Sequence, residues 1–208
     1  MDVAKSSINA VSPIRLCSCY GGTNLIGSIL DANESENLTD KYVLGEALGW
    51  GQFGVIRECV DKFSGENLAC KSIAKDRLVT QEDLCNIKLE IEIMKKLSGH
   101  PNVVDLKAVC EEENYVHLVM ELCAGGELFH RLEKHGRFSE SEARLFFRHL
   151  MQVVMYCHDN GVVRRDLKPE NILLSTKASS STIKIADFGL VTYIQSGQSL
   201  HGTVGSPF

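Results

Sequence analysis

The clearest pattern along the chain is an amphipathic helix that begins shortly after Thr80. Its apolar positions recur at intervals of three and four residues, which places them on one helical face. They are Leu84, Ile87, Ile91, Met94 and Leu97. Thr80 followed by Asp83 resembles a capping box, although Glu or Gln is the usual third partner. Residues 99–102, Gly-His-Pro-Asn, end the predicted helix.

A second long helix follows Ser139, which forms an S-x-x-E capping box with Glu142. Its predicted apolar stripe consists of Ala143, Phe146, Leu150, Val153 and Cys157. Gly161 suits the end of this helix because glycine readily adopts the left-handed backbone conformation found there.

The segments around the first helix read as strands. Residues 42–58 read as two strands around a glycine turn, and residues 68–73 read as a third. Two more strands fit residues 103–111 and 115–122, separated by an acidic turn. Strands therefore dominate the first part of the chain and helix the second, which predicts an α+β fold with two lobes.

The predicted domain organisation is a tail followed by one two-lobed domain. Residues 1–40 show no sustained periodicity and end in a polar run, so we expect a disordered tail. The domain covers residues 41–208. Its β-rich lobe spans about residues 41–120, and a partial helical lobe spans about residues 124–208.

Composition narrows the class of protein. A hydrophobic fraction of 44% and a charged fraction of 24% are those of a soluble globular protein. The net charge of −5 disfavours nucleic acid or an anionic membrane as the main partner. No apolar run approaches the length of a membrane span, and the eight cysteines form no C-x-x-C pair. We expect an intracellular, cytoplasmic or nuclear protein, with a plastid transit peptide in the acid-poor first thirty residues as an alternative.

Gly49, Gly51 and Gly54 form a G-x-G-x-x-G loop, in which the backbone can approach a phosphate closely. Two unrelated folds use this pattern. A dinucleotide-binding fold requires a helix directly after the loop. Residues 55–59 read instead as a strand, so we favour a glycine flap between two strands that covers nucleotide phosphates.

Lys71 lies in an apolar strand, where a buried ammonium group needs an anion. ATP phosphates would supply one, and so would Glu90 or Glu92 on the following helix. Its position before Met94 favours Glu90. The alternative is a solvated lysine at a strand end and a solvated glutamate on a helix face.

A third group of polar residues follows the second helix. Asp166, Lys168 and Asn171 lie in one loop, and the sequence Asp-Phe-Gly begins at Asp187. Phosphoryl transfer needs positioning, charge neutralisation and a group that takes the hydroxyl proton. Asp166 can accept the proton, Lys168 can stabilise the moving phosphoryl group, and Asn171 and Asp187 offer oxygen ligands for Mg²⁺. The alternative is a chance pattern, which the order of all these motifs makes remote.

From about Tyr42 to Phe208 the chain resembles eukaryotic protein kinases of the calcium/calmodulin-dependent kinase group. Within that group it is similar to plant kinases related to phosphoenolpyruvate carboxylase kinase. Lys168, two residues after Asp166, is the form typical of serine/threonine specificity. The resemblance implies an enzyme that uses ATP and Mg²⁺ to phosphorylate Ser or Thr hydroxyls of protein substrates.

The resemblance also implies roles for individual residues. Lys71, paired with Glu90, would hold the α- and β-phosphates, and Met120 would be the gatekeeper. The other implied nucleotide contacts are Leu48 and the three glycines at the phosphates, Ile56 and Ala69 above the adenine, Leu173 below it, the backbone of Glu121 and Cys123 at its edge, and Glu127 at the ribose.

Further implications concern partners and regulation. Carboxylates at Glu127 and Glu170 suggest a substrate with basic residues before its target Ser or Thr. Ser206 stands where relatives contact the catalytic Asp and Lys, and Ser199 and Thr203 are weak candidates for phosphorylation. No EF-hand loop is present in the sequence, so direct calcium control has no support.

The sequence departs from the family pattern in two places. Arg164 occupies a position that holds His in the family, where the side chain stacks on Phe188. An unpaired guanidinium there would cost several kcal/mol, so we expect it to turn outward or to find a carboxylate. The chain also stops before an A-P-E motif, so we expect an incomplete domain with exposed apolar surface at Phe147, Met151 and Val154. The alternative function is an ATP-binding fragment with little or no transferase activity.

Overall fold

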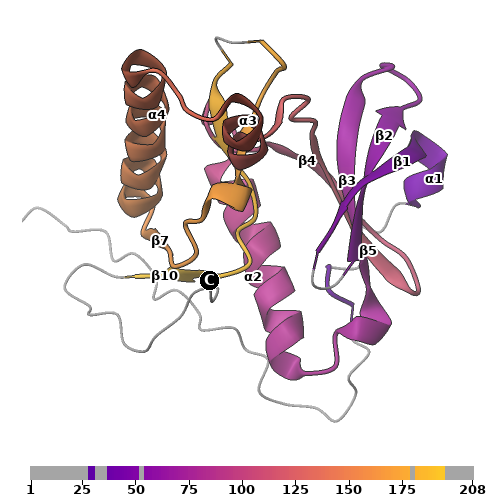
Figure 1. Cartoon of the computed structure of the whole chain (residues 1–208). Coiled ribbons are helices and arrows are strands. Elements are labelled where there is room, and N and C mark those ends of the chain that lie inside the picture. The colour runs from indigo at the N-terminus through magenta and orange to yellow at the C-terminus, as the bar shows by residue number, and fades with distance from the viewer. Residues whose placement is uncertain (1–27, 31–36, 52–53, 179–180, 195–208) are drawn as a thin grey trace, which may run out of the picture.

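The computed structural model describes residues 28–30, 37–51, 54–178 and 181–194. It has the predicted α+β architecture: a twisted sheet with one long helix, and a second group of helices and short strands beside them (Figure 1). In the view of Figure 1 the sheet lies on the right, α4 on the left, and α2 between them.

The large sheet is antiparallel, with the strand order β1-β2-β3-β5-β4. Its strands are β1 (Tyr42–Trp50), β2 (Gly54–Asp61), β3 (Asn67–Ala74), β4 (Leu106–Glu111) and β5 (Tyr115–Glu121). These match the predicted strands except that β4 begins three residues late. Residues 102–104 instead bond to Ile185, through Ile185 N–H to the Asn102 carbonyl at 2.8 Å and Val104 N–H to the Ile185 carbonyl at 3.0 Å.

Both predicted long helices are present, α2 (Gln81–Leu97) and α4 (Glu140–Asp159). Each begins with a complete capping box. The Asp83 N–H donates to the Thr80 hydroxyl at 3.1 Å, and the Glu142 N–H donates to the Ser139 hydroxyl at 3.3 Å. The apolar face of α2 is buried from Ile87 to Leu97, as predicted. The predicted stripe of α4 is wrong at its first residue, because Ala143 lies in the first turn of the helix and is exposed.

The sequence pattern gave no bounds for several short elements. They are α1 (Leu38–Lys41), the 3-10 turns η1 (Lys75–Arg77) and η2 (Pro169–Asn171), α3 (Leu128–His135), and the strands β6 (Gly126–Glu127), β7 (Val162–Arg164), β8 (Ile172–Leu174), β9 (Ile183–Ile185) and β10 (Val191–Tyr193). The helix α3 gave no start signal because Glu127 makes no side-chain cap. It ends at Gly136, which has a φ of 78°.

Two short stretches of the predicted disordered tail, residues 28–30 and 37–40, lie in the described structure and are packed, whereas disorder of the other residues of the tail stays a prediction. Ile29, Leu30 and Leu38 are 7%, 8% and 2% exposed. Leu38 belongs to an apolar cluster on the outer side of the sheet, together with Tyr42 and Cys59. Packed structure therefore begins before the predicted boundary at residue 41.

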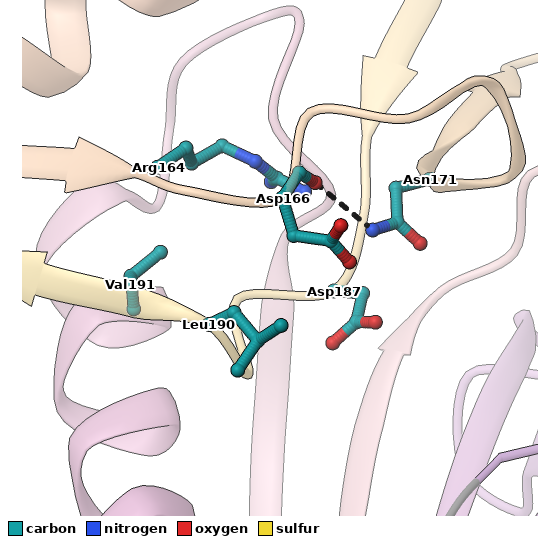
Figure 2. A pocket seen from close by; sticks show the side chains of 6 residues that line it. All are labelled: Arg164, Asp166, Asn171, Asp187, Leu190 and Val191. Atoms are coloured by element: carbon teal, nitrogen blue, oxygen red, sulfur yellow. Dashed lines mark hydrogen bonds between the residues drawn. The ribbon is translucent and has the colours of Figure 1, made fainter. Parts of the chain in front are cut away.

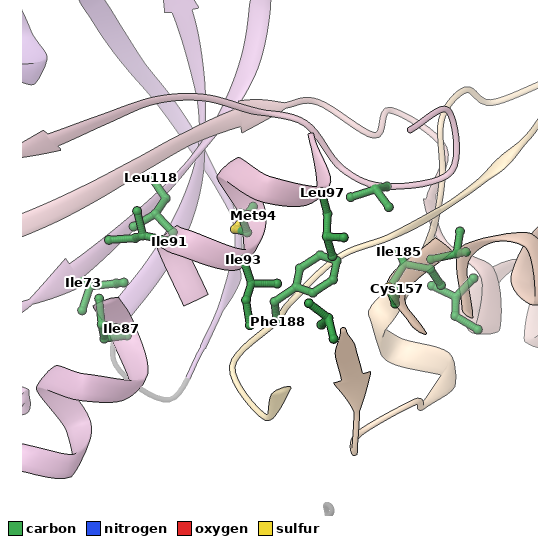
Figure 3. Close-up of a cluster of buried hydrophobic side chains, with 14 of the residues drawn as sticks. Ile73, Ile87, Ile91, Ile93, Met94, Leu97, Leu118, Cys157, Ile185 and Phe188 are labelled. Atoms are coloured by element: carbon green, nitrogen blue, oxygen red, sulfur yellow. The ribbon is translucent and has the colours of Figure 1, made fainter. Parts of the chain in front are cut away.

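The main core runs through both groups of elements without a break. It joins Ile73 of the sheet, Met94 of α2 and Cys157 of α4 to Phe188, whose side chain is 0% exposed. Figure 3 shows the ring of Phe188 among side chains of α2, close to Ile93 and Leu97. This continuity fixes the segment that follows Asp187 against α2.

Two small sheets arrange the loops between the helices. β7 pairs with β10, and β8 pairs with both β6 and β9. β7 leads directly to Asp166, β8 begins just after Asn171, and β9 leads to Asp187. These three polar side chains are therefore delivered by neighbouring strand ends.

The predicted exposed apolar surface on α4 is present only in part. Phe147 is 62% exposed, whereas Met151 and Val154 are half-buried. Among the described residues, no helix is both long enough and apolar enough to cross a membrane.

Candidate active site

Lys71 and Glu90 form an ion pair between the sheet and α2. The Lys71 Nζ lies 2.7 Å from the Glu90 Oε1, and the two side chains are 18% and 3% exposed. Burial alone would lower the pKa of Lys71, but the charges of Glu90 and Asp187 outweigh it and raise the pKa above its usual value. Glu92, the alternative partner, accepts a hydrogen bond from the Tyr193 hydroxyl at 2.9 Å instead.

The loop after β7 holds a second set of polar side chains. Lys168 Nζ lies 2.9 Å from Asp166 Oδ2. The Asn171 amide donates to the Asp166 backbone carbonyl at 3.3 Å, which ties the two ends of the loop together. Asn171 is buried, and η2 fixes its backbone. Figure 2 shows the side chains of Asp166, Asn171 and Asp187 around one pocket.

Asp187 has a left-handed backbone conformation, with a φ of 59°. A non-glycine residue rarely adopts this conformation, and such strain gathers at functional sites. The conformation is held on both sides. The Ala186 N–H donates to the Asn171 carbonyl at 3.0 Å, and the Gly189 N–H donates to Asp187 Oδ1 at 3.1 Å.

The Asp187 carboxylate is the electrostatic centre of the site. Its charge raises the pKa of Lys71, where it acts together with Glu90 against burial. The pKa of Lys168 is raised mainly by the hydrogen bond that Lys168 makes with Asp166, and the charge of Asp187 adds to this shift. Residues from the sheet and from the loop after α4 thus face one carboxylate, although they are nearly one hundred positions apart in sequence.

Arg164 points into the same pocket from β7. Its Nη2 donates to the Ala186 carbonyl at 2.9 Å, and its Cζ lies 4.7 Å from the centroid of the Phe188 ring. Its Nη1 is buried and has no hydrogen-bond partner among the described residues. Burial lowers the pKa of Arg164 below its usual value, despite the opposing charge of Asp187. The expectation that Arg164 would turn outward or pair with a carboxylate is therefore wrong: it stacks on Phe188 and bonds a backbone carbonyl.

The glycine loop lies at the β1–β2 connection, and residues 52–53 fall outside the described part. The Gly51 N–H donates to the Gly54 carbonyl at 2.9 Å. A side chain at Gly54 would overlap the Ser72 carbonyl, so the close approach of β2 to β3 requires glycine there. A side chain at Gly49 or Gly51 would meet no atom within 4 Å, so the loop has open space beside its backbone.

The predicted adenine contacts lie on neighbouring strands. Ala69 of β3 pairs with Met120 of β5, and Glu127 of β6 pairs with Leu173 of β8. Ala69 is buried, Ile56, Met120 and Leu173 are half-buried, and Leu48 and Glu127 are exposed.

The end of β5 and the connection after it carry the two residues predicted at the adenine edge, Glu121 and Cys123. The Glu121 N–H donates to the Asp105 carbonyl at 3.0 Å. Burial raises the pKa of the Cys123 thiol to about 12, which keeps it neutral.

Two contacts around the site were missed by sequence reasoning. Lys184, just before Asp187, pairs with Glu121 at 2.7 Å and so ties β9 to the end of β5. Tyr193 of β10 bonds Glu92, and Lys96 lies 5.0 Å from the centroid of the Tyr193 ring. No local sequence pattern predicts either contact, because the partners lie 63 and 101 positions apart.

The donor set suits magnesium held together with a nucleotide. Asn171 and Asp187 offer one amide oxygen and one carboxylate, both lining the pocket in Figure 2. Mg²⁺ commonly takes one or two protein ligands and completes its shell with phosphate oxygens and water. The described residues contain no cluster of three or more His, Cys, Asp or Glu that would form an all-protein metal cage. The predicted regulatory residues Ser199, Thr203 and Ser206 lie outside the described residues.

Comparison with known proteins gives a consistent picture. Residues 42–208 match the protein kinase domain family. Calcium-dependent protein kinase 10 of Oryza sativa subsp. japonica is 45% identical over 198 residues, which cover 95% of this chain and 33% of that protein. Calcium-dependent protein kinase 13 of the same plant is 47% identical over 88% of this chain and 33% of its own length.

A relative from a second plant shows the same partial coverage. Calcium-dependent protein kinase 34 of Arabidopsis thaliana is 45% identical over 88% of this chain and 35% of its own length. The chain thus spans about a third of the length of the curated relatives it matches. The more detailed likeness to kinases related to phosphoenolpyruvate carboxylase kinase stays a prediction.

Proposed function

The chain belongs to the protein kinase family, in the calcium/calmodulin-dependent group of serine/threonine kinases, and from this premise we propose that it transfers the γ-phosphate of ATP to Ser or Thr hydroxyls of proteins. The observation that carries the proposal is the convergence of two groups on Asp187. One is the buried Lys71–Glu90 pair, and the other is the loop of Asp166, Lys168 and Asn171.

In this proposal Lys71 binds the α- and β-phosphates. Glu90 holds the Lys71 ammonium in place, so little freedom is lost when the nucleotide binds. Gly49 and Gly51 let the backbone of the flap approach the phosphates, because no side chain stands between them. Ala69 and Leu173 contact the two faces of the adenine, and the Glu121 carbonyl and Cys123 N–H bond its edge.

Asp166 accepts the proton of the substrate hydroxyl as the phosphoryl group moves. Lys168, 2.9 Å from Asp166, stabilises the charge that develops on the moving group. Asn171 and Asp187 hold Mg²⁺, which neutralises charge on the nucleotide phosphates. The hydrogen bond from Asn171 to the Asp166 backbone keeps the proton acceptor and the metal ligand in a fixed relation.

The proposed substrates are proteins with basic residues before the target Ser or Thr. Glu127 and Glu170 are both exposed, so their carboxylates are open to an approaching arginine side chain. A peptide library that varies the three positions before the target residue tests this preference. A neutral or acidic preference would contradict it.

A second candidate is an ATP-binding module with little transfer, and Arg164 is the observation that favours it. Its guanidinium lines the pocket of the metal ligands and carries a buried Nη1 without a partner among the described residues. A cation there opposes the binding of Mg²⁺ beside Asp187. The two candidates share ATP affinity and differ in turnover.

The test uses the purified chain with radiolabelled ATP, Mg²⁺ and basic peptides. Kinase function predicts transfer that Asp166→Asn abolishes while ATP affinity is kept. Asp159→Asn, at the exposed end of α4, is the matched control and should change nothing. ATP binding without transfer in the parent chain would support the second candidate, and absence of ATP binding would overturn both.

A further inference from the structure

Residues 28–30, here called the clip, dock on the carboxylate of Glu111. The Ser28 hydroxyl donates to Oε2 at 2.8 Å, the Ile29 N–H donates to Oε1 at 2.9 Å, and the Leu30 N–H donates to Oε2 at 2.7 Å. The partners are more than eighty positions apart in sequence. Both carboxylate oxygens therefore receive bonds from one short segment, which is a specific arrangement and not a casual surface contact.

The same carboxylate also holds the turn that leads into α2. Lys75, at the start of η1, places its Nζ 2.8 Å from Glu111 Oε1. The two side chains are largely buried, so the lysine balances the charge of the glutamate away from solvent. Glu111, the last residue of β4, thus joins the clip, the sheet and η1.

Apolar contacts extend this junction to the helix itself. Ile29 and Leu30 are buried in the same continuous apolar cluster as Leu78 and Ile87. Leu78 stands between η1 and α2, and Ile87 is three residues before Glu90 on α2. In Figure 1 the short indigo segment lies beside the turn that precedes α2.

We propose that the clip is an intramolecular docking segment that holds the start of α2 against the sheet and so keeps Glu90 on Lys71. The proposal rests on the proposed role of that ion pair in nucleotide binding. When the clip is docked, Glu111 fixes η1, and the two apolar side chains cover the first turns of α2. When it is released, the two apolar side chains lose their contacts, the Glu111 carboxylate retains Lys75 but loses its three bonds from the clip, and α2 is free to move.

The exposed Ser28 makes the docking sensitive to charge. Its hydroxyl lies 2.8 Å from a carboxylate oxygen, so an acidic group at this position would face Glu111 directly. Ser28→Asp should therefore release the clip, whereas Ser28→Asn, of similar size and without charge, should retain most of the docking.

The main experiment compares Ile29→Glu/Leu30→Glu with Val79→Glu in the 208-residue chain. Val79 is exposed beside the start of α2, so its change adds the same kind of charge without touching the clip. Amide hydrogen exchange in residues 84–94 should accelerate about tenfold in the double variant and remain unchanged in the control. Binding of ATP should weaken about fivefold in the double variant alone.

Rescue separates docking from general damage to the fold. A synthetic peptide of residues 25–34, added in excess to the double variant, should restore the exchange protection of α2 and the ATP affinity. The same peptide with both apolar residues changed to Glu should restore neither. Where the double variant does not fold, Ser28→Asp, which leaves the Lys75–Glu111 pair in place, gives the same measurement with Ser28→Asn as its control.

The outcomes distinguish this proposal from the proposed function. Faster exchange confined to residues 28–30 and the end of β4, with α2 unchanged, would overturn the clip while leaving kinase function intact. A parent chain that does not bind ATP would overturn the proposed function, and the exchange of α2 would still decide whether the clip holds the helix.

Discussion

Two cations enter the candidate site from opposite sides, and the protein treats them differently. Lys71 comes from the sheet and meets the Glu90 carboxylate at 2.7 Å. Arg164 comes from the loop side and meets a backbone carbonyl and an aromatic ring, with one buried nitrogen unpaired among the described residues. Both cations are largely buried, but only Lys71 is in direct contact with a carboxylate.

The directions of the two pKa shifts express this difference. Burial lowers the pKa of both groups. For Lys71 the charges of Glu90 and Asp187 prevail and the pKa rises, whereas for Arg164 burial prevails and the pKa falls. A charge is thus stabilised inside this protein by a carboxylate in direct contact, and proximity to Asp187 alone is insufficient.

The largest expected effect comes from removing the carboxylate that contacts Lys71, which would leave Lys71 without a contacting carboxylate, as Arg164 is. Glu90→Gln leaves a buried ammonium without its carboxylate and should lower the free energy of unfolding by about 3 kcal/mol. Urea unfolding measures it. The double variant Lys71→Met/Glu90→Gln should be more stable than Glu90→Gln alone, because the stranded charge is gone. Equal stability of the two variants would contradict the comparison.

Removing the other partner should act mainly on the nucleotide. Lys71→Met should weaken ATP binding about thirtyfold, equivalent to about 2 kcal/mol. Isothermal titration with ATP and Mg²⁺ measures it. Lys107→Met, an exposed lysine of β4, is the control and should bind normally. Unchanged affinity in Lys71→Met would remove Lys71 from the site.

The next effect comes from removing the unpaired nitrogen on the loop side. Arg164→His replaces the guanidinium with an imidazole ring that can still stack on Phe188 and removes the buried Nη1, so the free energy of unfolding should rise by about 1 kcal/mol. Phosphoryl transfer should rise with it. Arg148→His, on the exposed side of α4, is the matched control. A less stable Arg164→His variant would mean that the stacking and the Ala186 bond outweigh the orphaned donor.

The smallest effect concerns the two capping boxes, one in each group of elements. Hydrogen bonds from Thr80 lower the pKa of Asp83, and hydrogen bonds from Ser139 lower the pKa of Glu142. In both cases the backbone N–H contributes most and the hydroxyl comes second. A carboxyl group whose pKa is lowered by folding stabilises the folded state at any pH above its ordinary pKa. This stabilisation is lost as the pH falls through the lowered pKa of the folded state. Unfolding measured from about pH 7 to about pH 3 should show Asp83→Asn and Glu142→Gln converging on the parent chain in acid. A difference that is constant with pH would contradict this.

Sequence reasoning succeeded where the signal is local or carried by a motif. The capping boxes and apolar spacing predicted α2 and α4, and the position of Glu90 before Met94 selected it over Glu92 as the partner of Lys71. It failed for α3, which lacks a capping side chain, and at residues 29, 30 and 38, which looked like part of a tail. The roles assigned to the nucleotide and metal ligands, and the lobe boundaries, stay predictions.

By itself, the sequence determined which residues carry the chemistry and which local elements hold them. Spacing along one helix or strand is a property of the chain, so no distant partner is needed to recognise it. The tertiary structure alone decided which distant groups neutralise one another. It brought Lys184 to Glu121, residues 28–30 to Glu111, and Arg164 to the ring of Phe188. Such pairings depend on the packing of the whole core, because a buried charge or donor takes whichever partner the fold brings within reach.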